Sequence, residues 1–73
     1  MKERRYVICI DNEGYPASLE VRKLYEYMVD AQAESLGQIR VIDESGEDYL
    51  YPADRFVSLD LSAEVMEAVS RAA

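Results

Sequence analysis

The chain of 73 residues contains no histidine, and this absence removes several kinds of chemistry. Histidine is the side chain that titrates near neutral pH and the commonest metal ligand. Without it, neither a serine–histidine nor a cysteine–histidine nucleophile pair can form. Paired carboxylates need an apolar cleft that raises one pKa, and so short a chain offers little cleft. We therefore expect no enzyme, no catalytic residue and no cofactor.

A single cysteine, Cys9, excludes an internal disulfide, on which small secreted domains usually depend. It lies between two isoleucines with no basic residue within three positions to lower its pKa, so we interpret it as a buried, inert side chain. The chain also lacks a membrane-length apolar run and a signal-peptide pattern. These absences favour a protein of the reducing bacterial cytoplasm that binds no membrane.

Positive charge is scarce. The net charge is −7, and residues 41–73 hold eight acids against two bases. Nucleic-acid affinity comes mostly from lysine and arginine that release counterions, so we expect no direct binding to DNA or RNA. The charge favours a partner with a basic surface, although it could serve only to keep the protein soluble and monomeric.

Length and composition indicate one folded domain over residues 1–73, with its core at 5–61 and a helix at 62–73. Residues 5–10 are apolar on both faces, which predicts a central strand buried on both sides. Two β-prone runs, 38–43 and 48–51, flank a short segment with a glycine and predict a hairpin.

Helical and extended interpretations compete for residues 17–37. Periodicity alone slightly favours one amphipathic helix. Aromatic and β-branched residues at 24–29 favour a strand instead. Asp30 would then cap a helical turn over 31–36, with Gly37 as its left-handed end.

The C-terminal part predicts a short alternating strand over residues 56–61 and a helix over 63–72. Ser62 is a good N-cap for this helix. Its apolar side chains should face inward, and these are Val65, Met66 and Val69.

This order of strands and loops resembles the Src-homology-3-like barrel. The segment Tyr51-Pro52-Ala53-Asp54-Arg55-Phe56-Val57 is similar to the proline, short turn, aromatic and valine run before the last strand of that fold. The resemblance covers roughly residues 6–60 and extends to small bacterial proteins of this type. It implies a mainly β fold, a small Src-homology-3-like barrel of about five strands with a short C-terminal helix, and it favours a strand at 24–29.

The family binds proline-rich peptides on a shelf of aromatic side chains. Pro52 and Phe56 match the shelf proline and one shelf aromatic. The family's tryptophan would fall at residues 36–38, and this chain has no tryptophan. Its paired tyrosines would fall at residues 8–11, which are not aromatic. The resemblance therefore implies the barrel and not the ligand.

Four carboxylates surround a glycine in the predicted hairpin, and they belong to Asp43, Glu44, Glu47 and Asp48. A calcium loop has acids at alternating positions and a sixth-position glycine, whereas these acids come in adjacent pairs. Adjacent strand residues point to opposite faces, so the four cannot all converge. We interpret the segment as a charged turn in preference to a cation site, and we predict no metal.

Six tyrosines are a mild excess. Tyrosine is favoured at interfaces, although it also packs in cores with its hydroxyl at the surface. We predict a non-enzymatic protein-interaction module, a monomer or weak homodimer. Its predicted contact residues are Tyr15, Tyr49, Tyr51, Pro52, Glu44, Glu47 and Asp48. The alternatives are a nucleic-acid mimic or toxin-neutralising regulator that occupies a basic groove, and a small-molecule or metal-binding accessory of an enzyme.

Overall fold

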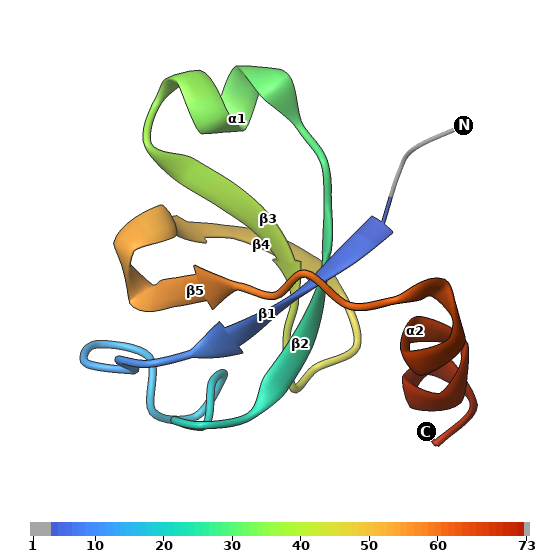
Figure 1. Ribbon diagram of the computed structural model, residues 1–73. Coiled ribbons are helices and arrows are strands. Elements are labelled where there is room, and N and C mark those ends of the chain that lie inside the picture. Colours follow the sequence, from blue (N-terminus) through green and yellow to red (C-terminus); the bar gives the residue numbers. More distant parts are fainter. Residues whose placement is uncertain (1–3, 73) are drawn as a thin grey trace.

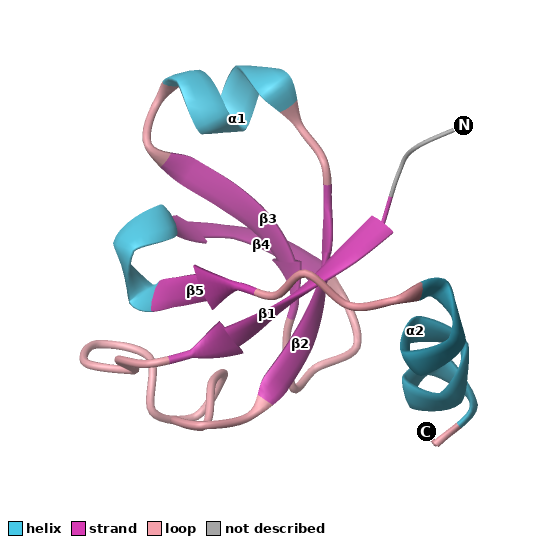
Figure 2. Cartoon of the chain, in the orientation of Figure 1, coloured by secondary structure: helices cyan, strands magenta, loops and turns pink. Residues whose placement is uncertain are grey.

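The computed structural model describes residues 4–72 and shows a mainly β fold (Figure 1). Five antiparallel strands form one open sheet, and a short C-terminal helix follows it (Figure 2). The strands are β1 (Arg4–Cys9), β2 (Leu24–Met28), β3 (Gln38–Ile42), β4 (Asp48–Pro52) and β5 (Phe56–Ser58). The helical elements are α1 (Ala31–Ser35), the single 3-10 turn η1 (Ala53–Arg55) and α2 (Ala63–Arg71).

The strands lie in the order β4-β3-β2-β1-β5, so β4 and β5 are the edges of the sheet. β5 returns to pair with β1, and Cys9 lies opposite Phe56 in that pair. The sheet curls strongly. This curl brings its two edges close, so that the ring centroid of Tyr51 on β4 lies 6.2 Å from that of Phe56 on β5. The two edge strands do not pair with each other, so the sheet remains open.

Residues 24–28 form strand β2, and the long-helix interpretation is wrong. The strand is flanked by β1 and β3, which supply partners for its backbone on both sides. The short turn after it is confirmed. Asp30 Oδ1 accepts a hydrogen bond from the Ala33 N–H at 3.1 Å, and Gly37 has a φ of 73° at its end.

One face of the curled sheet encloses the core. Each strand contributes to it, and so does Leu19, which lies in the loop before β2 and has no exposed area. The buried cluster consists of Val7, Cys9, Leu19, Tyr25, Val41, Tyr51 and Phe56. Cys9 is fully buried as predicted.

The predicted burial of the first strand on both faces is wrong. β1 is central, but only Val7 and Cys9 on its inner face are buried. Ile8 is half-buried, and Ile10, just past the strand, is 51% exposed. A single sheet has one enclosed face, and α2 lies over the other face only in part. Apolar residues on both sides of a strand therefore do not establish two packing layers.

The last strand is shorter than the predicted 56–61. β5 ends at Ser58, and the Leu59 N–H still donates to the Tyr6 carbonyl at 3.2 Å. Beyond that bond the chain leaves the sheet and runs out to α2 (Figure 1). Alternating polarity continues past Ser58, but the pairing of β5 with β1 ends there.

Helix α2 begins at its predicted cap, since the Ser62 hydroxyl accepts a hydrogen bond from the Val65 N–H at 3.2 Å. The predicted inward orientation of its three apolar residues holds only in part, because Met66 and Val69 line cavities beneath the helix whereas Val65 does not. Val65 is 45% exposed, Met66 and Val69 are only half-buried, and the helix has no buried residue. Within residues 4–72 no helix is long and apolar enough to cross a membrane.

Candidate functional site

The three tyrosines predicted as contact residues line one cavity of about 350 Å³, which we call the β4 cavity. Tyr49 and Tyr51 share a face of β4 because they are two residues apart. Tyr15 reaches them from the loop before β2, and its ring meets that of Tyr51 edge to face at 5.0 Å between centroids. Tyr51 is buried and out of a partner's reach. Tyr49 is 50% exposed, so a partner can contact it. The remaining residues of the cavity are Ser18, Asp43, Ser45 and Leu50.

Asp43 forms part of the cavity wall, and we did not predict it as a contact residue. It is 7% exposed. Its Oδ1 accepts hydrogen bonds from the Ser45 N–H at 2.8 Å and the Ser45 hydroxyl at 2.5 Å. Its Oδ2 accepts the Tyr51 hydroxyl at 2.5 Å. An aspartate two residues before a serine in a turn predicts the hydrogen bond from the Ser45 N–H to Asp43. It does not predict the contact of Asp43 with Tyr51.

The Asp43 carboxylate is ionised at neutral pH. Burial by itself would raise its pKa, but the hydrogen bonds from Ser45 and Tyr51 outweigh burial and hold the pKa below its ordinary value. Among the described residues its donors are all neutral hydroxyl or amide groups, and no cation is paired with it. The cavity wall therefore carries a negative charge that no cation within residues 4–72 is paired with.

Glu44 belongs to the same turn but serves mainly to attach it to the rest of the chain. Its Oε2 accepts hydrogen bonds from Lys23 Nζ and the Tyr25 hydroxyl, both at 2.5 Å. These bonds, led by that from Lys23, hold the Glu44 pKa below its ordinary value. Lys23 also lies 3.6 Å from a carboxylate oxygen of Glu20, so one cation is shared by two acids.

The other predicted contact residues lie outside the β4 cavity. Asp48 points to the opposite face of β4, where its Oδ2 lies 3.0 Å from Arg40 Nη1. Arg40 also pairs with Asp30 at 3.0 Å, so this cation too is shared by two acids. Pro52 is half-buried at the end of β4, and Glu47 is exposed in the turn. Among the described residues, no group of three or more acidic or cysteine side chains is placed to hold a metal ion.

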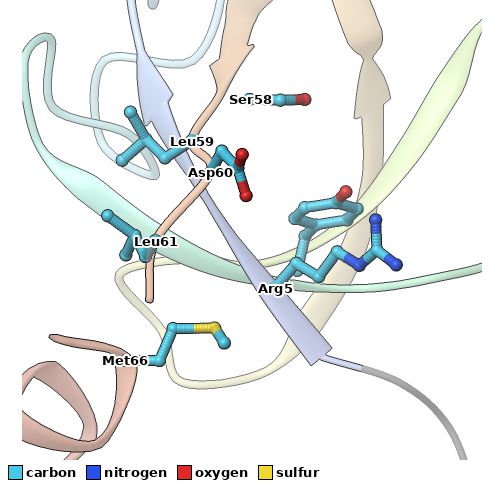
Figure 3. A pocket seen from close by; sticks show the side chains of 7 residues that line it. Arg5, Ser58, Leu59, Asp60, Leu61 and Met66 are labelled. Atoms are coloured by element: carbon cyan, nitrogen blue, oxygen red, sulfur yellow. The ribbon is translucent and has the colours of Figure 1, made fainter. Parts of the chain in front are cut away.

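Larger cavities lie beside α2. One of about 480 Å³ is bounded by Arg5, by Met66, and by the end of β5 with the linker that follows it, residues 58–61 (Figure 3). Ser58 and Asp60 point to one side of that linker, and the two leucines point to the other (Figure 3). Another of about 550 Å³ lies between α2 and the outer face of β1 and β2. Neither cavity is lined by a buried charged group among the described residues. We interpret both cavities as gaps beneath a loosely packed helix.

The contact between Tyr51 and Asp43 predicts a loss of stability at alkaline pH. Burial, followed by the hydrogen bond to Asp43, raises the pKa of Tyr51 from 10.0 to about 12. Because this pKa is higher in the folded chain, its contribution to stability is complete below pH 10.0 and is lost as the pH rises through about 12. Replacing Tyr51 with phenylalanine should flatten this loss relative to the unchanged protein, as measured by urea unfolding across that interval. A slope that the Tyr51→Phe change leaves unaltered would contradict the contact.

No protein-family model matches the chain, and neither a curated protein nor a solved structure matches it. The Src-homology-3-like resemblance therefore stays a prediction. What the protein does must be inferred from the contacts, burial and charges of the described residues.

Proposed function

We propose that this chain is a non-enzymatic interaction module that binds a basic segment of another protein at the β4 cavity. The observation that carries the proposal is the buried, ionised Asp43 beside the half-exposed Tyr49, with which no cation of the described part of the chain is paired. A lysine or arginine of the partner can pack its alkyl stem against the Tyr49 ring. Its charged end then points toward the Asp43 carboxylate. Recognition here requires neither a catalytic group nor a cofactor.

The surrounding charge supports a basic partner. Glu47 is exposed in the same turn, and the nearby cations Lys23 and Arg40 are each shared between two carboxylates. The region therefore stays negative, in a chain whose net charge is −7. Such complementarity steers association and selects the partner. A nucleic-acid mimic is less well supported, because Asp43 and Asp48 lie on opposite faces of the sheet.

We also propose that the open sheet is a small Src-homology-3-like barrel. The return of β5 to β1, the 3-10 turn between β4 and β5, and the contact between Tyr51 and Phe56 across the curled sheet support this assignment. Phe56, which matches an aromatic of the family's peptide shelf, is buried in the core at 8% exposure. The proline-rich ligand of the family therefore gains no support, and the proposed site lies at β4 instead.

The proposal is tested by titrating isotope-labelled protein with heptalysine while amide chemical shifts are recorded. We expect the shifts to move at Ser45 and Tyr49, and the binding to weaken as salt rises. Replacing Asp43 with asparagine keeps its acceptor oxygen for Ser45 and removes the charge, and we expect about a tenfold loss of affinity.

The matched control is Asp60→Asn, which removes the same charge from an exposed residue of the linker to α2. It should weaken heptalysine binding much less than Asp43→Asn. Equal losses of affinity in the two variants would show that heptalysine responds only to net charge. The β4 cavity would then not be the binding site. Thermal unfolding of both variants checks that the fold is retained.

A further inference from the structure

The outer edge of β4 presents backbone groups that no other described strand pairs with. Within residues 4–72, β4 pairs with β3 on one side and with no strand on the other. At the end of this ladder the Asp43 N–H donates to the Glu47 carbonyl at 3.1 Å. Bonding residues alternate along an antiparallel strand, so Tyr49 and Tyr51 also direct their N–H and C=O groups toward β3. Leu50, between them, directs both of its backbone groups away from the sheet.

Two cavities flank this outward-facing position, one on each face of the strand. The β4 cavity lies on the inner face, and a cavity of about 230 Å³ on the outer face is lined by Leu36, Arg40 and other residues around α1. Leu50 lines both cavities. Leu50 is 42% exposed and Leu36 is 72% exposed, so apolar surface is available beside the outer cavity.

We propose that the partner binds as an extended segment added to the edge of β4, with basic residues alternating with apolar ones. Main-chain hydrogen bonds to Leu50 and its neighbours would align the segment, and successive side chains would point to opposite faces. The basic side chains enter the β4 cavity toward Asp43, and the apolar side chains cover Leu36 and Leu50. The inference rests on the proposed function and specifies how the partner is held.

Charge decides against a second copy of this chain as the occupant. Every copy carries −7, and a β4–β4 pair would bring the exposed Glu47 and Asp48 of one copy onto another chain of the same sign. Acidic groups at a sheet edge are a usual protection against such self-pairing. Pro52 also limits the edge, because it offers a carbonyl but no N–H. This limit applies to any added strand and leaves the N–H of Leu50 available, whereas the repulsion between like charges does not apply to a basic segment.

The test compares two peptides of identical composition and charge. One alternates, Lys-Val-Lys-Val-Lys-Val-Lys, and the other does not, Lys-Lys-Val-Val-Lys-Lys-Val. Only the alternating peptide can direct all lysines to one face of an added strand. We expect it to bind at least about tenfold more tightly and to slow hydrogen exchange at the Leu50 amide. The Tyr49 amide, which already bonds β3, serves as the internal control.

Two substitutions at one position separate the backbone from the side chain. Leu50→Pro removes the outward N–H without removing a bond to β3, and it should reduce the affinity for the alternating peptide to that for the other. Leu50→Ala keeps the N–H and should lose less. If the proline variant does not fold, the exchange measurement on the unchanged protein still decides the question.

The possible failures are distinguishable. Equal affinity for the two peptides, with no slowing of exchange at Leu50, would overturn strand addition and leave the basic-segment proposal standing. If neither peptide binds, both proposals fail. A doubled mass in sedimentation, lost in the proline variant, would show instead that a second copy occupies the edge.

Discussion

Replacing Leu19 with alanine should lower the free energy of unfolding by about 3 kcal/mol. Leu19 has no exposed area and belongs to the core cluster, although it lies in the loop before β2. Its carbonyl also accepts a hydrogen bond from Asn12 Nδ2 at 2.9 Å, so the backbone is held where the side chain enters the core. Removing the side chain leaves a cavity. The loop cannot move in to close it, because its backbone is held by the hydrogen bond from Asn12.

The size of the protein makes this effect large. A domain of this length has a stability of only about 4–10 kcal/mol, so such a loss should leave it marginally folded. Urea unfolding followed by circular dichroism measures the change. Leu36→Ala is the matched control, because Leu36 is 72% exposed and its loss should change stability by less than about 0.5 kcal/mol. Similar losses for the two variants would mean that the loop does not close the core.

Replacing Asp43 with alanine should have the second-largest effect, about 2 kcal/mol of lost stability. The change leaves the buried Tyr51 hydroxyl and the Ser45 N–H without their acceptor. Asp43→Asn retains an oxygen acceptor and should cost about half as much. Glu47→Ala, an exposed acid in the same turn, is the control and should be nearly neutral.

Acid should reduce the difference between Asp43→Ala and the unchanged protein. The Asp43 pKa lies below its ordinary value of 3.8, so its contribution is complete above that pH and is lost as the pH falls through the folded-state pKa. Chemical unfolding at about pH 7 and about pH 3 measures this. A difference that stays constant with pH would show that the carboxylate charge contributes nothing, and that only the shape of the side chain matters.

The same contacts give the proposed site its rigidity. Asp43 holds Ser45 through one oxygen and Tyr51 through the other, and Tyr15 packs on the ring of Tyr51. Only Tyr49 and Leu50 then present substantial apolar surface at the edge of β4. A preorganised wall reduces the entropy lost on binding, which favours recognition of an extended segment by few contacts.

Short-range rules determined much of the fold. The hairpin of β3 and β4 followed from two β-prone runs around a glycine-containing turn. Asp30 and Ser62 both act as helix caps, because a cap depends only on an acceptor side chain and the N–H three residues later. These features involve residues close in the chain, so the sequence alone was sufficient for them.

Tertiary structure decided the rest. Residues 24–28 carry patterns of both helix and strand, and pairing with β1 and β3 made them a strand. Tyr49 and Tyr51 have the same residue type and face, yet only Tyr51 is covered, because Tyr15 comes from a distant loop and Phe56 from the opposite edge of the sheet to pack on it. The burial of Leu19 arises in the same way. A sequence pattern specifies which side chains share a face, whereas what covers that face depends on how distant parts of the chain meet.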